Sequence, residues 1–310
     1  MNTLPSMRSY TFMFTAIIAW GLSTPFIEFG LLYITPFPFL AYRFIFAAVI
    51  ITPYVIITRS KELGKMLKNK WVWAIGISES LGLILQYIAQ SMGVTAGLAA
   101  LLSLMFLVMV PFLSPLFLTE KIYKYHGFAI IVALVGIYYI SFPSGINSQN
   151  NNSTPFIGVI LLLGSALSYG LYIIFTSRYT TIENRDVDTF SLFYVVLVII
   201  SIFSSLTTIT FDSFKPIQGE LWIWLIGISL IPTIIAFFSY FEALKTIPAN
   251  TSSVLLPMQL IVPFITDYFI VRRIYGFSTV LGILCIIVSM AIVVITPLIT
   301  KLGDDNGTGT

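Results

Sequence analysis

Apolar residues follow one another along this chain in ten long stretches, which begin near residue 10 and end near residue 297. Each stretch holds roughly 20 residues, the length of a helix that crosses about 30 Å of hydrocarbon. Because backbone groups in lipid must bond within the protein, each stretch predicts a membrane-spanning helix. The predicted spans are residues 10–30, 36–58, 71–91, 96–118, 124–141, 156–177, 189–211, 221–243, 250–271 and 276–297.

One part of this pattern occurs twice. The stretch Trp71–Tyr123 opens WVWAIGIS, and Trp222–Tyr275 opens WIWLIGIS 151 residues later. The repetition divides the chain into two repeats of five spans, residues 10–141 and 156–297, followed by a tail at 298–310 that we expect to be disordered and cytoplasmic. We therefore predict an all-α polytopic membrane protein with ten transmembrane helices. Five is an odd number, so the second repeat is inserted upside down relative to the first.

Lys and Arg are distributed unevenly over the two sides that this topology defines. If the N-terminus is inside, twelve of these residues fall in inner segments and three in outer ones, while Arg43 lies within a span. Cytoplasmic loops of membrane proteins are enriched in Lys and Arg. We therefore expect a multi-pass protein of the cell membrane with both termini in the cytoplasm. The inner residues are Arg8, Arg59, Lys61, Lys65, Lys68, Lys70, Lys121, Lys124, Arg178, Arg185, Lys245 and Lys301, and the outer ones are Lys215, Arg272 and Arg273.

Composition excludes several classes of function. With 57% hydrophobic and 9% charged residues, the chain is far from a soluble protein, which carries about 25% charged residues. The net charge of +3 is explained by the cytoplasmic loops, so we expect no nucleic-acid partner. One histidine, His126, and one cysteine, Cys285, offer neither a metal cluster nor a catalytic nucleophile with its base. We expect no metal, no cofactor and no enzymatic activity.

Inverted repeats predict a mechanism. They are a recurrent architecture of secondary transporters, in which the substrate site lies near the membrane midplane where the repeats meet. We expect a carrier in the lipid bilayer, as a monomer or a homodimer, that moves a small molecule by alternating access. The alternative is a channel, or a receptor or scaffold without carrier activity. No ring of like charges indicates a channel filter.

Short motifs in both halves suggest a family. The first half carries Trp20-Gly21 and Pro25, Arg43 with Ala47-Ala48, Gly97, Ala99 and Ala100, Pro111, Glu120, Gly127 and Gly136. The second half carries Gly158, Tyr169-Gly170, Tyr172 and Arg178. In order and spacing these motifs resemble the drug/metabolite transporter superfamily, specifically its ten-helix members with two EamA-type repeats. One departure is that Arg272 and Arg273 stand where the family commonly has a glutamate at the end of the ninth helix.

The resemblance implies transport of a small metabolite, such as an amino acid, a nucleotide sugar, a sugar phosphate or an amphipathic drug. It also implies a central site surrounded by the first, third, sixth and eighth helices. Four aromatic residues of those helices, Trp20, Tyr87, Tyr172 and Tyr240, are therefore expected to line the site.

The third span contains an isolated acid, Glu79, whose counterpart in the second repeat is Leu230. Glu79 lies roughly 13 Å into the span, near the bilayer centre. Gln86 and Gln90 follow on the same helix face, so the three predict a wall of a water-filled cavity. Desolvation favours the neutral form of such a carboxyl, so we expect it to exchange protons or to bind a cationic group of the substrate. The alternative is a neutral carboxyl bonded to a neighbouring helix.

Glu28 and Arg43 lie seven residues on either side of the turn at Thr35-Pro36, so the hairpin places them at about the same depth. We expect an ion pair, which serves either as a structural staple or as an outer gate that binds an anionic group. A base and an acid in the membrane, Arg43 and Glu79, together suit a zwitterion such as an amino acid.

The ninth span predicts a second polar stripe, with Gln259 and Asp267 at helical spacing. Its prolines, Pro257 and Pro263, predict a bend that lines a cavity. The favoured interpretation of Asp267 is a pair with Arg272 or Arg273 at the outer surface, so we assign it to a gate or an ion pair.

Overall fold

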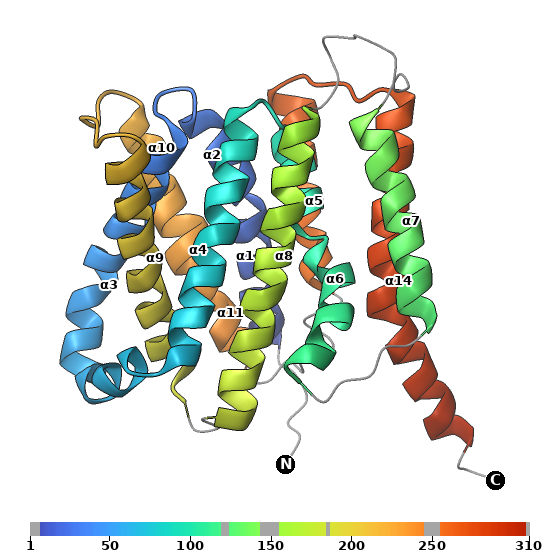
Figure 1. Ribbon diagram of the computed structural model, residues 1–310, viewed down its shortest axis with the longest axis horizontal. Helices are drawn as coiled ribbons and strands as arrows, with labels where there is room; N and C mark the ends of the chain where they lie inside the picture. The colour runs from blue at the N-terminus through green and yellow to red at the C-terminus, as the bar shows by residue number, and fades with distance from the viewer. Residues whose placement is uncertain (1–6, 119–123, 143–154, 184–186, 245–254, 308–310) are drawn as a thin grey trace.

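The structure is a computed structural model, and it describes residues 7–118, 124–142, 155–183, 187–244 and 255–307. The described residues form helices joined by short connections (Figure 1). The first repeat consists of α1 (Met7–Gly21), α2 (Ser23–Gly30), α3 (Pro36–Leu67), α4 (Lys70–Ser91), α5 (Ala96–Ser103), α6 (Phe106–Leu113), the short η1 (Ser114–Leu116) and α7 (Lys124–Ser141).

The second repeat begins with α8 (Phe156–Arg178), η2 (Tyr179–Glu183), α9 (Thr189–Phe211), α10 (Leu221–Ser229), η3 (Leu230–Ile235) and α11 (Ala236–Leu244). It continues with η4 (Leu256–Leu260), α13 (Ile261–Ile265), η5 (Thr266–Ile270) and α14 (Phe277–Gly307). Among these, η4 is a 3₁₀ helix, whereas η2, η3 and η5 are π-helical.

Every predicted span corresponds to a helical segment. Within the described residues, eight segments are long and apolar enough to cross a membrane, and two shorter apolar helices, Leu256–Ile270 and Phe277–Val293, correspond to the ninth and tenth predicted spans. The all-α polytopic fold is therefore confirmed. α14 continues as a helix to Gly307, through most of the tail that the sequence predicts to be disordered.

The two repeats run in opposite directions. In Figure 1, α1 rises from the lower end of the molecule and α8 descends from the upper end. Met7 at the start of α1 and Gly307 at the end of α14 both lie at the lower end, which we call the termini face; the other end is the opposite face. The predicted inversion of the second repeat is thus confirmed.

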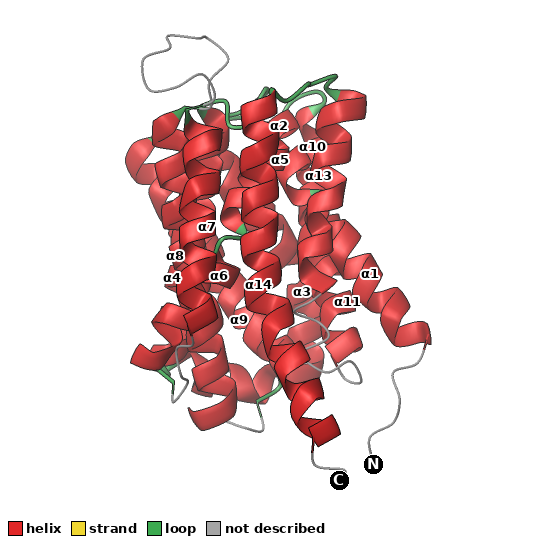
Figure 2. Ribbon diagram, turned by 90° about the vertical axis from the view of Figure 1, so that its right-hand side faces the viewer, coloured by secondary structure: helices red, strands yellow, loops and turns green. Residues whose placement is uncertain are grey.

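Helix pairing follows the same symmetry. α4 packs against α8, and α11 packs against α1, so exchanging the two repeats converts one pair into the other. The pairs α3 with α9 and α7 with α14 are converted into themselves by the same exchange. Figure 2 shows α7 beside α14 and α1 beside α11. These symmetric pairs are among the contacts along which the two repeats meet, and α4–α8 and α1–α11 carry many of the polar residues discussed below.

In the α7–α14 pair, α7 has one side that faces lipid and one side that packs against α14. Phe128, Ile131 and Leu134 are exposed on the outer side of α7, as expected of side chains that face hydrocarbon. On the inner side, a Cβ on Gly136 would lie 2.7 Å from Ile286 and 2.8 Å from the carbonyl oxygen of Gly282. Small residues thus allow the two backbones to touch. Lipid tails are as apolar as the side chains, so membrane helices associate through close packing of this kind.

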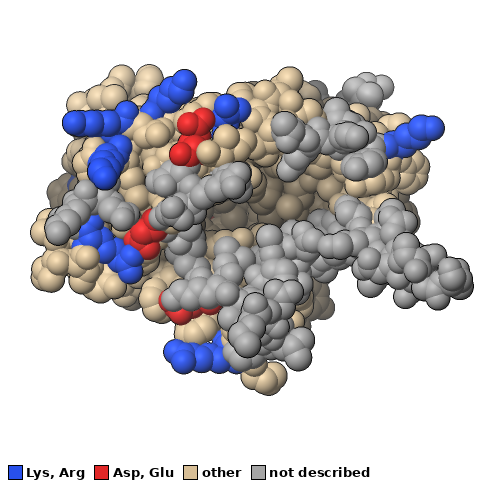
Figure 3. All heavy atoms as spheres, turned by 90° about the horizontal axis from the view of Figure 1, so that it is seen from below, with Lys and Arg blue, Asp and Glu red and all other residues tan. Residues whose placement is uncertain are grey.

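Basic side chains gather on the termini face. Figure 3, which views this face, shows Lys and Arg around its rim. The described ones at helix ends on this side are Arg8, Arg59, Lys65, Lys68, Lys70, Lys124 and Arg178.

Candidate functional site

Arg43 lies at the centre of the first polar cluster. It projects from α3, is 4% exposed, and is bound by hydroxyl groups from three other elements. Its Nε donates to Thr233 Oγ1 over 3.0 Å, and its Nη1 donates to Tyr87 Oη over 3.2 Å and to Ser23 Oγ over 3.3 Å. Nη2 has no hydrogen-bond partner among the described residues. A guanidinium held this way keeps its orientation and retains donors for a ligand.

The sequence favours the position of this cluster through local irregularities. Ser23 begins α2 directly after the break in helix geometry at Leu22. Thr233 lies in the π-helical η3, one residue after Pro232, where its hydroxyl also donates to the carbonyl of Ile228 over 2.9 Å. π-helical turns inside α-helices occur frequently at functional sites. The repeat position of Glu79 in this half, Leu230, is the first residue of η3.

Glu79 lies near Arg43 but is not bonded to it. Its Oε2 is buried and has no hydrogen-bond partner among the described residues. The carboxyl interacts electrostatically with Arg43 on α3 and with Tyr169 and Tyr172 on α8. A buried carboxylate oxygen without a partner costs free energy, on the order of 1–3 kcal/mol or more, which a proton or a ligand group would offset.

The two glutamines that share the helix face of Glu79 are both buried and both bonded. Gln86 Oε1 accepts from Tyr169 Oη over 2.6 Å, and Gln90 Nε2 donates to the carbonyl of Thr24 over 2.9 Å. They therefore join α4 to α8 and to α2. Gln90 Oε1 has no partner in the described part of the chain, so this end of the stripe keeps one unused acceptor.

The four aromatic residues expected at the site lie around these groups. Tyr87 is fully buried and bonded to Arg43. Tyr172 interacts electrostatically with both Glu79 and Tyr240. Tyr240 in turn packs against Trp20, with ring centroids 4.9 Å apart. A continuous set of polar and aromatic side chains thus extends from α3 through α4 and α8 to α11 and α1.

Gln259 lies against α1. It belongs to η4, and its carbonyl oxygen lies 2.7 Å from the position of a Cβ on Gly21. The ninth span therefore packs closely against α1 at the residue after Trp20. The prolines that predict a bend in this span lie in η4 and α13, where the helix changes from 3₁₀ to α and then to π geometry.

A second polar cluster lies at the opposite face, and it corrects one expectation. Glu28 is paired with Arg273, not with Arg43: Nη1 and Nη2 of Arg273 each donate to Glu28 Oε1 over 3.1 Å. Arg273 also binds Asp267, with Nη1 2.9 Å from Oδ1. The hairpin argument gave equal depth for Glu28 and Arg43, but the two side chains leave their helices in different directions.

The same two acids cap α5. Glu28 Oε2 accepts from the amide of Ala96 over 2.7 Å, and Asp267 Oδ2 accepts from the amide of Gly97 over 2.9 Å. Both amides lie at the start of α5, where a helix has unpaired donors and a partial positive charge. The hydroxyl of Tyr275 also donates to Asp267, which is fully buried. We call this set of Glu28, Asp267, Arg273 and Tyr275 the opposite-face cluster.

The sequence did not predict several residues that form hydrogen bonds to the polar side chains of these clusters. Ser23 and Thr233 are uncharged, and the one local signal that could have pointed to Thr233 is the neighbouring Pro232. Tyr169 was noted as part of a motif but not as the partner of Gln86. No group of three His, Cys, Asp or Glu residues that could hold a metal ion occurs in the described ranges.

Comparison with known proteins shows which family the chain resembles. A family model described as "EamA-like transporter family" matches residues 7–142 and 156–295. An uncharacterized transporter from Archaeoglobus fulgidus is 26% identical over 210 residues, which cover 66% of this chain and 61% of that protein. A second uncharacterized transporter from the same organism is 23% identical over 298 residues, which cover 93% of this chain and 99% of that protein.

Two further matches extend the comparison. YvbV, an uncharacterized transporter of Bacillus subtilis, is 26% identical over 221 residues, which cover 70% of this chain and 68% of that protein. A solved structure described as "Crystal structure of protein" superimposes with a TM-score of 0.63 at 17% identity, covering 95% of this chain and 98% of that one. At this identity the solved structure supports the fold alone.

Proposed function

Because the chain belongs to the EamA-like transporter family, we propose that this membrane transporter moves a small zwitterionic metabolite, such as an amino acid, by alternating access of its two inverted repeats. The family is one of transporters, so the expectation that the chain is not an enzyme is confirmed. The relatives are themselves described as uncharacterized transporters, so the substrate class is argued from the site.

The observation that carries the proposal is the relation between Arg43 and Glu79. Arg43 is buried, Glu79 is half-buried with a buried Oε2, and the two side chains act on each other electrostatically without forming an ion pair. Nη2 of Arg43 offers donors with the geometry that a carboxylate accepts. Glu79 Oε2 offers an unfilled acceptor that an ammonium group would satisfy. A zwitterion placed between them would pair with both.

The aromatic residues would complete the site. Tyr172 lies beside Glu79, and Tyr240 and Trp20 continue the aromatic surface from it, which suits the hydrocarbon part of a small metabolite. Cation–π attraction between these rings and an ammonium group would add to the binding. Gln86, Gln90 and Gln259 would then support the helices around the site.

The opposite-face cluster would be the gate. It joins α2 of the first repeat to η5 and the segment that follows η5 in the second, so these elements cannot separate while Arg273 is bound to Glu28. Opening toward that face would require the Glu28–Arg273 contact to break, while the Asp267–Arg273 contact within the second repeat could persist. Lys and Arg are concentrated on the termini face, which supports a cytoplasmic location for that face and an outward location for this gate.

Two roles for Glu79 fit the site, and they differ in their pH dependence. If Glu79 binds the ammonium group of the substrate, then Glu79→Gln weakens substrate binding at every pH. If Glu79 carries the coupling proton, then Glu79→Gln leaves exchange of substrate intact but abolishes accumulation driven by a pH gradient. In both roles the substitution changes transport, and a variant with the wild-type rate and pH dependence would contradict the proposal.

The test is flux in proteoliposomes. A thermal-shift screen of the purified protein against amino acids and related metabolites would first identify a ligand, and radiolabelled uptake would then be measured. A carrier gives saturable uptake that is stimulated by substrate on the far side, whereas a channel gives conductance. Tyr172→Phe, beside Glu79, should reduce uptake. Tyr194→Phe is the matched control, because its hydroxyl bonds to Thr52 in the α3–α9 pair, away from the site.

A further inference from the structure

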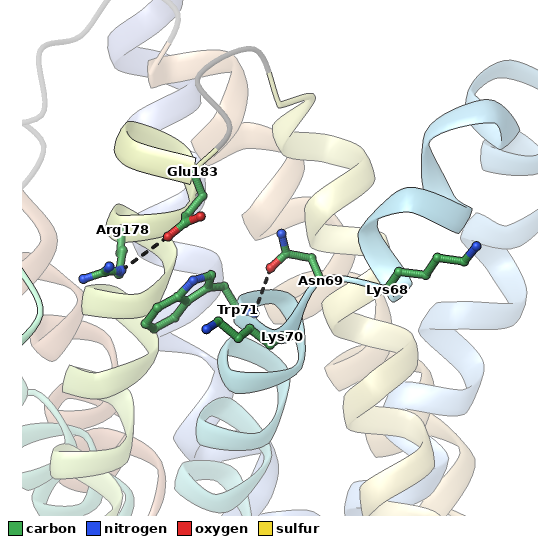
Figure 4. A pocket seen from close by; sticks show the side chains of 6 residues that line it. All are labelled: Lys68, Asn69, Lys70, Trp71, Arg178 and Glu183. Carbon is green, nitrogen blue, oxygen red and sulfur yellow. Dashed lines mark hydrogen bonds and ion pairs between the residues drawn. The ribbon is translucent and has the colours of Figure 1, made fainter.

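A separate cavity lies on the termini face, where α4 begins and α8 ends. Its volume is about 360 Å³, within the range of small-molecule sites, ~300–1,000 Å³. It is distinct from the central site, which lies deeper in the bundle. Its lining residues, drawn in Figure 4, are Lys68, Asn69, Lys70, Trp71, Arg178 and Glu183.

Two side chains form a rigid wall of this basic pocket. The guanidinium of Arg178 lies over the ring of Trp71, 4.5 Å from its centroid, and its Nη1 donates to the carbonyl of Phe117 over 2.7 Å. Trp71 also packs against Phe175, with ring centroids 5.7 Å apart. Arg178 is thereby fixed with its charge at the cavity, and the aromatic surface beside it can take an apolar group.

The lining carries an excess of positive charge without matching acids. Lys68, Lys70 and Arg178 contribute three positive charges and Glu183 one negative charge, with Arg178 Nε 3.6 Å from Glu183 Oε1. Neither lysine has a carboxylate partner in the described part of the chain. The ammonium of Lys70 instead lies 5.6 Å from the ring centroid of Trp71, on the Arg178 side of the pocket (Figure 4).

Lys70 is also unfavourably placed for the helix that carries it. It is the first residue of α4, and a cation at a helix N-terminus is repelled by the helix dipole. Asn69 caps this helix through Oδ1, which accepts from the amide of Trp71 over 2.9 Å, and its side-chain nitrogen stays available to donate into the cavity. An anion bound here would offset the repulsion and use donors that are already oriented.

We propose that the basic pocket binds an organic phosphate, held by Lys70 and Arg178, with Asn69 as a further donor. Trp71 would pack against the carbon skeleton next to the phosphate. Two kinds of molecule could supply this phosphate: the headgroup of an anionic phospholipid, or a soluble phosphate ester. Basic pockets between membrane helices on the cytoplasmic side are known to hold anionic headgroups.

The test uses the purified full-length protein in a neutral detergent. Binding is measured by native mass spectrometry and by thermal shift with phosphatidylglycerol, phosphatidylcholine and glycerol 3-phosphate. Lys70→Gln should weaken binding about fivefold, the effect of one surface charge on an anionic lipid. Glu183→Gln removes the acid at the rim and should strengthen binding. Lys65→Gln, on the same face but outside the pocket, is the matched control and should leave affinity unchanged.

The binding results distinguish a phospholipid headgroup from a soluble phosphate ester, and some results would overturn the proposed site. Binding of phosphatidylglycerol without glycerol 3-phosphate identifies a lipid site, and comparable binding of both identifies a phosphate-ester site. Equal weakening by Lys65→Gln and Lys70→Gln would mean general attraction to a basic face and would overturn the proposal. Binding of phosphatidylcholine as tight as that of phosphatidylglycerol, no effect of Glu183→Gln, or no binding of any probe would overturn it as well.

Discussion

Glu28 and Arg273, 245 residues apart in the chain, are joined by two hydrogen bonds of 3.1 Å that end on one carboxylate oxygen. Arg273 holds Asp267 at the same time. A single guanidinium therefore links an acid of the first repeat to an acid of the second. Two carboxylates at the start of one helix would repel each other without it, so this arginine offsets their repulsion and ties α2 to the second repeat.

Arg273→Gln should destabilise the protein. It would leave Asp267, which is fully buried, without its counterion, and breaking a buried pair costs on the order of 3 kcal/mol. The melting temperature in detergent measures the loss. Arg272→Gln removes the same charge from the neighbouring position, which has no ion pair among the described residues, and should change stability by less than about 0.5 kcal/mol. Equal losses in the two variants would show that the pairing contributes nothing specific.

Gly97→Ala should disrupt the same cluster by shape alone. A Cβ at this position would lie 2.6 Å from Asp267 Oδ2 and 2.8 Å from the ring of Phe264. We expect a lower melting temperature and loss of transport. Gly127→Ala is the matched control, because a Cβ there meets nothing within 4 Å and alanine favours a helix by about 1 kcal/mol over glycine. A stable, active Gly97→Ala protein would contradict the packing.

Asp188 should make stability depend on acid pH. It caps α9, accepting from the amide of Ser191 over 3.0 Å, and it forms an ion pair with Arg59 of α3. Burial raises the pKa of Asp188, but bonds from Ser191 and Arg59 outweigh burial and leave the pKa below its ordinary value. A lowered carboxyl pKa contributes stability that is complete above about pH 4 and is lost as the pH falls through the folded-state pKa.

Asp188→Asn is the corresponding experiment. Asparagine keeps the helix cap but cannot titrate, so the variant should lose less stability than wild type between neutral and acid pH. Asp212 at the other end of α9 also has a lowered pKa, chiefly because Thr35 donates to it, and it remains in this variant. The double variant Asp188→Asn with Asp212→Asn should therefore reduce the fall in melting temperature at acid pH further. Melting temperatures that fall with pH as steeply as in wild type would rule out this origin.

Arg43→Lys should impair transport while the protein still folds. Lysine keeps the charge but cannot bind Thr233, Tyr87 and a carboxylate at once with fixed geometry. Losing a hydrogen bond to a charged group costs about 1.5–3 kcal/mol, so uptake at low substrate should fall roughly tenfold or more. Arg8→Lys at the start of α1 is the control and should behave as wild type. Unchanged uptake by Arg43→Lys would remove Arg43 from the site.

The span boundaries could be predicted because a membrane imposes a length and a polarity on each helix. Residues 156–177 and 189–211 were predicted, and α8 and α9 occupy Phe156–Arg178 and Thr189–Phe211. Breaks within spans could not be predicted this way. α1 ends at Gly21 and α5 at Ser103 in the middle of apolar runs, where packing against other helices decides the local geometry.

The sequence predicted how deep the candidate site residues lie in the membrane, but not which partners their side chains reach. Periodicity placed Glu79, Gln86 and Gln90 on one face, and the structure has them there with different partners. The hairpin turn at Thr35-Pro36 placed Glu28 and Arg43 at a common depth, yet Glu28 binds α5 and Arg43 binds α4 and η3. The partner of a buried charge depends on residues far away in sequence, such as Arg273, and no local pattern contains them.

The contact between Gly136 and Gly282 restricts where anything can leak across this protein. A Cβ on Gly282 would lie 2.7 Å from the carbonyl oxygen of Gly136, so the backbones of α7 and α14 leave no room for a methyl group. A water molecule needs a comparable space, and it cannot pass between the two helices at this height. The α7–α14 pair is therefore closed to water at this contact. If the proposed alternating-access route is right, it therefore does not run between α7 and α14, and the part of the bundle that carries Arg43 and Glu79 remains its proposed course.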